Sequence, residues 1–271
     1  LEWPLPTQVI KTEKTDDGKS IISETNYTYN AKDLLASTSY NVDNSTITEK
    51  LKYPFEYTSD AVNQAMTAKN MIGQPIETIS LKDNVVRGAT KTEYSNSSGL
   101  YQPKTIYKAE FDTPVSEAIF NNSSTSFYKP VLNFDSYNAK GNLLQFKPAN
   151  GMPTYYVWGY KEQYPIAKLE NFTSSDASAI QSFITAAVDA SNLDTSPALE
   201  DALRAALASL RSAAPNAMAT TYTYDPLIGV TSITDTKGYT VYYQYDNFNR
   251  LKQVVDSAGY IVSKNEYNYK Q

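Results

Sequence analysis

The sequence of 271 residues contains no cysteine and no histidine. The two absences exclude Ser-His-Asp and Cys-His nucleophiles, zinc or haem sites built on these ligands, and disulfides. We therefore expect no catalytic residue of these kinds, no metal and no cofactor. A chain without thiols also suits an extracellular protein that avoids stray reactive sulfur.

Clustered positive charge and long hydrophobic runs are missing as well. Lys and Arg number 24 against 29 Asp and Glu, which gives a net charge of −5. Nucleic-acid surfaces need clustered Lys and Arg, so we expect no nucleic-acid partner, and an anionic membrane surface is disfavoured. No stretch approaches the ~20 apolar residues that span a bilayer. The chain begins at Leu1 without a charged and then apolar leader, which predicts a mature or excised piece.

Tyrosine, in contrast, is abundant: 23 residues against 9 Phe and 2 Trp. In the segment 239–246, Tyr and Val alternate with polar residues, as in a half-buried strand. Glycine-containing turns separate the strand-like runs, and Asn-Gly at 150–151 is the strongest hairpin signal. We predict a mainly β fold, an antiparallel meander of hairpins in an open or curled sheet. The other strand-like runs are 21–29, 76–81, 91–94, 104–109, 154–160 and 219–224.

One segment, 174–214, is rich in Ala and Ser and has helical spacing instead. Apolar residues recur at i, i+3, i+4 and i+7 from Ile180, and Ser196 followed by Pro197 marks a second helix start. We predict a two-helix hairpin at 174–214, inserted into the β protein. A shorter helix is expected near Ser59, with Val62 and Met66 facing inward; the second helix of the hairpin ends before Pro215.

The chain repeats itself. Tyr-Thr-Tyr-Asp at 222–225 recurs 21 positions later as Tyr-Gln-Tyr-Asp at 243–246, and the turn at 235–238 recurs at 256–259. Tyr would cover the sheet face, Asp or Asn would bond the turn amides, and neighbouring units must stack to bury that face. The residues assigned to this motif are Tyr29, Leu35, Tyr137, Gly141, Leu143, Gly151, Tyr222, Tyr224, Asp225, Gly238, Tyr243, Tyr245, Asp246, Arg250, Leu251 and Gly259.

This motif resembles the YD repeat of the Rhs (rearrangement hotspot) superfamily, and residues 243–251 are the nearest copy, with Asn249 in place of the usual glycine. The stretch 155–171 is similar to a variant in large Rhs-type surface proteins of Bacteroides. The resemblance implies a bacterial secreted or cell-surface protein and repeats that coil into β shells. It implies one YD-repeat-like β domain over 1–271, with terminal tandem repeats at 219–271. Some members cleave themselves at an Asp-Pro-x-Gly motif; the run at 225–229 has one residue too many, so that activity is not carried over.

Three aromatic residues are candidates for ligand binding. Tyr156, Trp158 and Tyr160 share one face of the predicted strand 154–160, and such a stripe can stack on sugar rings. A stripe of this kind is more often the core between packed layers. Both interpretations stay open at this point.

Other candidate sites have simpler explanations. Asp225 and Asp246 would be the carboxylate pair of a glycosidase, but their equivalent repeat positions favour turn capping. Ser126 and Lys129 have the spacing of a serine acyl enzyme, but its companion motifs are absent and the local sequence is strand-like. Asp-Asp-Gly at 16–18 lacks the further ligands of a calcium loop and predicts a turn.

The sequence thus predicts a non-enzymatic scaffold segment of a large secreted or cell-surface Rhs/YD-repeat protein. Its partners would be the rest of the parent polypeptide or neighbouring repeats. The alternative is a carbohydrate- or ligand-binding module that uses exposed aromatic residues, with glycans as partners.

Overall fold

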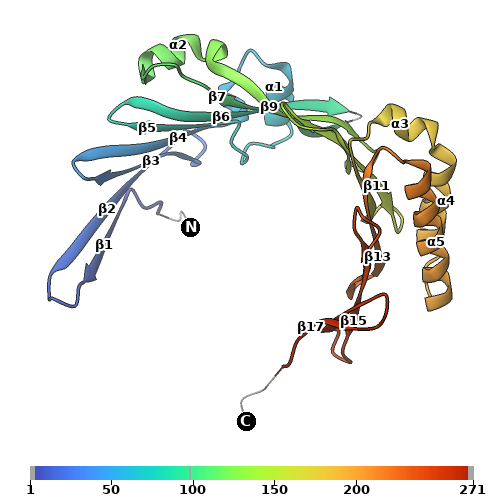
Figure 1. The fold of residues 1–271 in the computed structure, drawn as a ribbon. Helices are drawn as coiled ribbons and strands as arrows, with labels where there is room; N and C mark the ends of the chain where they lie inside the picture. The colour runs from blue at the N-terminus through green and yellow to red at the C-terminus, as the bar shows by residue number, and fades with distance from the viewer. Residues whose placement is uncertain (1–3, 98, 268–271) are drawn as a thin grey trace. The chain divides into compact units, whose positions relative to one another are not determined.

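The structure is a computed structural model that describes residues 4–97 and 99–267 (Figure 1). The chain divides into two compact units at residues 133 and 134. That the whole chain serves as a single domain therefore stays a prediction. The last residues of the expected terminal repeats, 268–271, lie outside the described part.

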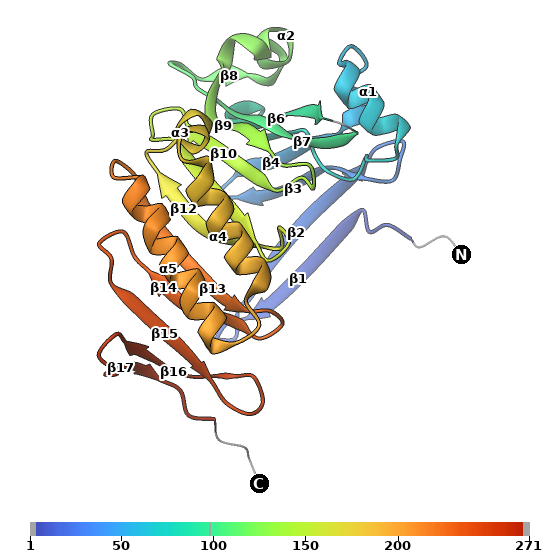
Figure 2. The same cartoon turned by 90° about the vertical axis from the view of Figure 1, so that its right-hand side faces the viewer.

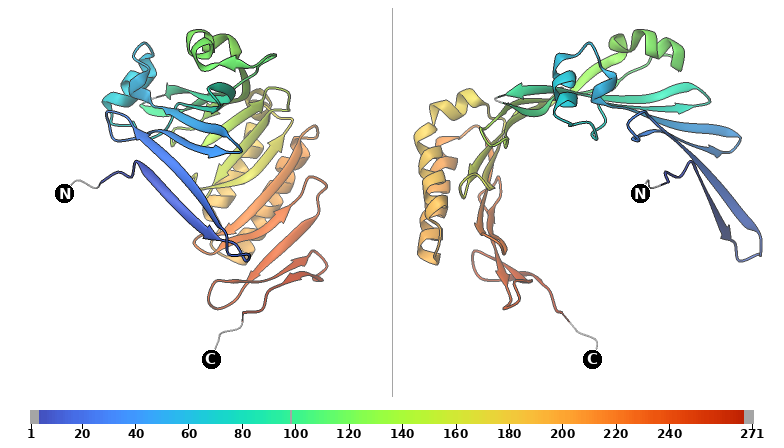
Figure 3. Two further views of the ribbon diagram at one scale, coloured as in Figure 1. Left: turned by 90° about the vertical axis from the view of Figure 1, so that its left-hand side faces the viewer. Right: turned by 180° about the vertical axis from the view of Figure 1, so that it is seen from behind.

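The first unit is an antiparallel ladder in which successive strands pair. Strand β8 pairs with the first two residues of β6, on the edge of β6 that is opposite β5. Strand β9 pairs with β7, and the boundary between the two units falls within β9. The first hairpin, dark blue in Figure 3, is exposed along the whole of its first strand. The strands are β1 (Gln8–Lys14), β2 (Ser20–Tyr29), β3 (Leu35–Val42), β4 (Ser45–Lys52), β5 (Glu77–Lys82), β6 (Val85–Ser97), β7 (Leu100–Ala109), β8 (Val115–Ser116) and β9 (Tyr128–Tyr137).

Three helices lie in this unit: η1 (Pro54–Glu56), α1 (Ala61–Ala68) and α2 (Glu117–Phe127). Helix α1 is the short helix expected near Ser59; Asp60 caps it and Met66 is 1% exposed. Helix α2 was not predicted. Its Phe120 is fully buried against aromatic rings and the apolar residues of β5 and β6.

A buried carboxylate ties these helices to the sheet. Glu77 of β5 is 3% exposed, accepts hydrogen bonds from the hydroxyls of Tyr57 (3.0 Å) and Tyr128 (2.6 Å), and pairs with Lys52 (2.8 Å). Burial alone would raise the pKa of Glu77, but these donors outweigh it and hold the pKa below its usual value. The carboxylate therefore stays ionised in the core and links β4, β5 and β9.

The second unit is a ladder in chain order. Every pair from β10 to β17 is antiparallel. The strands are β10 (Leu143–Pro148), β11 (Thr154–Gly159), β12 (Tyr164–Glu170), β13 (Met218–Asp225), β14 (Gly229–Thr234), β15 (Thr240–Tyr245), β16 (Leu251–Asp256) and β17 (Ile261–Lys264).

Three helices join β12 to β13 and are here called the helical insert: α3 (Ser174–Ala179), α4 (Gln181–Leu193) and α5 (Pro197–Ala213). Helices α4 and α5 lie side by side, α4 against β11 and α5 against β13 (Figure 2). The side chains of Leu203, Leu207 and Leu210 on α5 are 0–2% exposed. None of the helices in the described part of the chain has the length and apolarity needed to cross a bilayer.

The predicted mainly β antiparallel meander with inserted helices is confirmed. The first helix of the insert differs from the prediction, because it breaks at Ile180 into α3 and α4. Thr173 and Asp176 form a capping box at the start of α3, which fixes a short separate turn of helix there.

Candidate functional site

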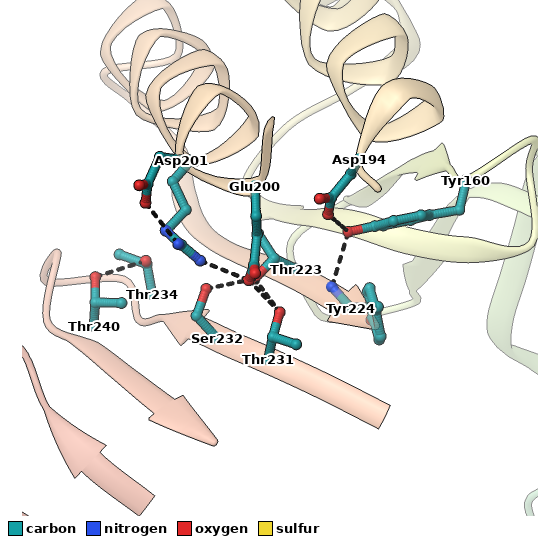
Figure 4. Close-up of polar contacts among 11 residues, drawn as sticks. Tyr160, Asp194, Glu200, Asp201, Thr223, Tyr224, Thr231, Ser232, Thr234 and Thr240 are labelled. Carbon is teal, nitrogen blue, oxygen red and sulfur yellow. Dashed lines mark hydrogen bonds and ion pairs between the residues drawn. The ribbon is translucent and has the colours of Figure 1, made fainter. Parts of the chain in front are cut away.

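A cluster of hydrogen-bonded polar side chains in the second unit lies where α5 meets the β13–β14 hairpin. Helix α5 begins where expected: the Ser196 hydroxyl accepts from Leu199 N and Pro197 occupies the first helical position. This start places Glu200 on the side of α5 that faces the sheet, while Leu203 enters the core. Figure 4 shows the polar side chains of the cluster around Glu200.

Glu200 is the centre of this cluster. Its Oε1 accepts from Arg204 Nη1 (2.6 Å), from the Thr223 hydroxyl (2.9 Å) and from the Thr231 hydroxyl (Figure 4). Arg204 also donates to Asp201 (2.7 Å). One carboxylate oxygen therefore joins the helix to two strands, and the guanidinium compensates its charge.

The hydroxyls of the cluster form one network with Glu200. Thr223 Oγ1 lies 2.9 Å from Glu200 Oε1, 2.7 Å from Thr231 Oγ1 and 2.6 Å from Ser232 Oγ, and Thr231 also contacts Glu200. Thr223 and Ser232 are 1% and 2% exposed. Because these hydroxyls contact one another and the carboxylate, the cluster is suited to hold α5 in register on the sheet.

A second link lies at the C-terminal end of α4, beside the start of α5. The Tyr160 hydroxyl donates to Asp194 Oδ2 (2.7 Å) and accepts from the backbone N–H of Tyr224 (2.9 Å). Burial raises the pKa of Asp194, and the negative charges of Glu200 and Asp225 raise it further. Burial also raises the pKa of Tyr224 to about 12, so the phenol stays neutral.

These acidic side chains border a cleft of ≈ 410 Å³ between the start of α5 and the end of β13. Among the described residues, no group of three or more acidic side chains is arranged to hold a metal ion. The sequence signals did not reveal this site, because Glu200 meets partners 23 and 31 positions away in the chain.

Five turns of the chain share one hydrogen-bond pattern. The first residue is Asn or Asp; its backbone N–H donates to the carbonyl of the fifth residue, and its carbonyl accepts from the fourth. Its Oδ1 accepts from the N–H groups of the third and fifth residues at 2.8–3.2 Å. The fourth residue has a positive φ in each turn. The turns begin at Asn30, Asn138, Asp235, Asp246 and Asp256.

Three tyrosines at strand ends, Tyr29, Tyr224 and Tyr245, have a second shared geometry. A register shift in the strand pairing falls immediately before Tyr29, Tyr224 and Tyr245. Each hydroxyl then donates to a backbone carbonyl, of Pro6 (3.1 Å), Pro165 (2.9 Å) and Val230 (2.9 Å) respectively. We call this contact the tyrosine strap, because the side chain fastens its strand to the neighbouring segment that precedes it in the chain.

The comparison with protein families matches a segment that contains three of these five-residue turns, at Asp235, Asp246 and Asp256. A family model described as RHS Repeat matches residues 229–261. The chain contains an RHS repeat. The match spans β14, β15 and β16 and reaches the first residue of β17, so it includes the predicted YD copy at 243–251.

Two solved structures are also similar to this chain. The Tc holotoxin pore of Photorhabdus luminescens is 12% identical with a TM-score of 0.35 and covers 87% of this chain. A TcdB2–TccC3 crystal structure is 11% identical with a TM-score of 0.32 and covers 95%. The present chain spans 12% of the length of each of those chains. No curated protein matches the sequence.

The predicted aromatic stripe is not continuous. Strand β11 ends at Gly159, so Tyr160 lies in the following turn with φ +50° and is 6% exposed. Trp158 is half-buried and its indole N–H donates to the Leu143 carbonyl (2.8 Å), while Tyr156 stacks on Phe146. The structure therefore brings Tyr156 and Trp158 near β10 and places Tyr160 beneath α4, beside Ser191.

Asp225 and Asp246, the two aspartates at equivalent positions of the predicted repeat, differ in their surroundings. Asp246 opens a five-residue turn and pairs with Arg250, whereas the Asp225 side chain makes no hydrogen bond to any described residue and borders the acidic cleft. Asp225 is followed by a different turn, in which Ile228 N–H donates to its carbonyl. The expected equivalence of the two turns is therefore wrong.

The two remaining candidates are the Ser126–Lys129 pair and the segment 16–18. Ser126 lies in the last turn of α2 and donates to the Ser123 carbonyl, while Lys129 lies in β9. The strand-like interpretation is thus wrong for Ser126. Residues 16–18 form the predicted turn, closed by a hydrogen bond from Gly18 N–H to the Thr15 carbonyl.

The RHS repeat turn at Asp246 gives a pH-dependent prediction. Hydrogen bonds from Arg250 lower the pKa of Asp246 to about 2, because they favour the ionised carboxylate. This stabilisation is complete above the unfolded-state pKa near 4 and is lost as the pH falls through about 2. We expect a carboxyl carbon NMR titration midpoint near 2 for Asp246. Arg250→Gln should move the midpoint upward, and an unchanged midpoint would contradict the assigned cause.

Proposed function

We propose that this chain is a non-enzymatic scaffold segment of a larger secreted or cell-surface RHS/YD-repeat protein, in which its last strand pairs with a neighbouring repeat of the parent polypeptide. The observation that carries the proposal is the unpaired, exposed edge of β17 in the described part of the chain. We also propose that the larger protein is of the Bacteroides type.

Strand β17 is open to pairing. Among the described residues it pairs only with β16, and all four of its residues are exposed. Tyr260, Ile261 and Val262 expose 73%, 57% and 62% of their surface. A flat edge strand with exposed apolar residues is a template for a further strand.

The repeat geometry also continues past β17. The Tyr267 hydroxyl donates to the Leu251 carbonyl at 2.9 Å, the same contact that Tyr245 makes with Val230. Asn265 N–H donates to the Lys252 carbonyl, which keeps this segment along β16. A tyrosine strap of the next unit is therefore already in place; the Asn268 that follows Tyr267 in the sequence lies outside the described residues.

Hydrogen exchange tests the proposal. In the parent polypeptide, the amides of β17 that bond no strand of this chain should exchange slowly, whereas in the isolated chain they should exchange fast. Amides of β15, which has a partner strand on each side, serve as the control and should be slow in both. Equally fast exchange of β17 in both proteins would exclude the proposed pairing.

The glycan-binding alternative is tested in the same samples. The scaffold proposal expects no binding on a glycan array and no change on Trp158→Phe. Glycan binding that disappears in Trp158→Phe, with an unchanged circular dichroism spectrum, would replace the scaffold proposal by the binding module.

A further inference from the structure

Helix α5 carries two arginines on the side that faces β13–β15, and only one of them has a carboxylate partner. Arg204 is paired with Glu200 and Asp201, whereas Arg211 lies seven positions on and forms no ion pair with a described residue. The Arg211 guanidinium donates from Nη1 to the Ala219 carbonyl. It has five N–H donors, so most of them have no acceptor in the described part of the chain.

Both arginines border a cleft of ≈ 280 Å³ between α5 and the strands. Its floor contains Thr221, which is 4% exposed and whose hydroxyl has no hydrogen-bond partner among the described residues. Thr234 and Thr240 share one hydrogen bond (2.8 Å), which leaves one of their two hydroxyl hydrogens free to donate. The ring of Tyr242, which lies under the Arg204 guanidinium, completes the wall.

We propose that this cleft is a binding site for a small organic carboxylate, in which Arg211 forms the ion pair and the Thr221 hydroxyl donates the second contact. A planar guanidinium binds a carboxylate through two parallel hydrogen bonds. The Tyr242 ring suits the apolar body of such an acid. The cleft is separate from the acidic cleft, because Glu200 and Arg204 lie between them.

Two features of the chain agree with this assignment. Burial lowers the pKa of Arg211, with the charge of Asp235 acting in the opposite sense, so the guanidinium is partly desolvated without a paired anion. Asp235 is the carboxylate that would compete for Arg211. Its Oδ1 is held by the N–H groups of Lys237 and Tyr239, which keeps it in the turn.

The arginine side-chain NMR spectrum provides the test, because the chain has only four arginines: Arg87, Arg204, Arg211 and Arg250. Benzoate is the probe, and benzamide, which has the same shape without the charge, is its control. Both are added at constant ionic strength. We expect benzoate to shift the Arg211 Nε–H signal saturably, while the Arg87 signal stays in place, and benzamide to shift neither.

Variants separate the site from a general charge effect. Arg211→Lys should weaken benzoate binding at least tenfold, since an ammonium lacks the bidentate fork. Thr221→Val, which keeps the side-chain shape, should weaken it about 2- to 10-fold. Arg87→Lys, on an exposed part of β6 in the other unit, should leave binding unchanged. Equal shifts by benzoate and benzamide, or full binding by Arg211→Lys, would overturn the proposal.

Discussion

Leu203→Ala is expected to lower the free energy of unfolding of the second unit by about 2–5 kcal/mol. Leu203 is 0% exposed and lies in the core cluster with Leu207 and Leu210 of α5 and with apolar residues of β11 and β12. Its truncation removes buried apolar surface and leaves a cavity between the helical insert and the sheet. Urea unfolding followed by Trp158 fluorescence, in a Trp3→Phe background with no other tryptophan, measures the change.

The matched control is Leu199→Ala on the same helix. Leu199 is 37% exposed, so its truncation should change stability by much less than that of Leu203. If the two variants unfold at the same urea concentration, α5 does not pack on the sheet through Leu203. A reduced slope of the urea dependence in Leu203→Ala would indicate that the insert detaches before the sheet unfolds.

The second large effect is expected at Gly159, where β11 passes directly under α4. A Cβ added there would lie 2.3 Å from Ser191 Oγ and 2.7 Å from Ile166 Cγ2. Ser191 is 1% exposed, and its hydroxyl accepts from Tyr160 N–H (3.0 Å) and donates to the Val188 carbonyl (2.6 Å). Gly159→Ala must displace these atoms, so we expect a loss of about 1–3 kcal/mol.

Gly88→Ala is the control for this prediction, because a Cβ at Gly88 in β6 meets no atom within 4 Å. It should leave stability unchanged or raise it, since alanine has less backbone freedom in the unfolded chain. Adding Ser191→Gly to Gly159→Ala should restore part of the lost stability. If Gly159→Ala is as stable as Gly88→Ala, the close approach of β11 and α4 is not required.

The sequence was sufficient to predict the elements whose patterns are local. Alternating Tyr and Val predict the strands because successive side chains point to opposite faces, and Ser196 with Pro197 marks the start of α5. Helix α2 could not be predicted, because Glu117–Phe127 contains Asn, Ser and Thr, which have low helix propensity. Burial of Phe120 in a cluster with Ile79 and Leu81 of β5 and Val86 of β6 stabilises this helix, and those strands are distant in the sequence.

The polar cluster at Glu200 could not be predicted from the sequence for a related reason. Nothing local distinguishes Glu200 from the other acidic residues of α5; its role depends on Thr223 and Thr231, which reach it only when α5 lies on β13 and β14. The end of β11 was missed because Gly159 and Tyr160 continue the alternating pattern, while the packing of α4 bends the chain there.

The five-residue turns use only Oδ1 of their first residue and leave its other terminal atom, Oδ2 of Asp or Nδ2 of Asn, for other contacts. Each copy of the turn can therefore bind a different partner through this atom. Because Oδ1 alone satisfies the turn, Asp and Asn are equally good turn residues and the chain is free to vary the other atom. In Asp246, Oδ2 binds Arg250; in Asn138, Nδ2 donates to Glu162 across to another turn (3.0 Å). In Asn30, the buried Nδ2 has no hydrogen-bond partner among the described residues. An array of near-identical units can in this way acquire local charge and cross-links one unit at a time without disturbing the backbone it repeats.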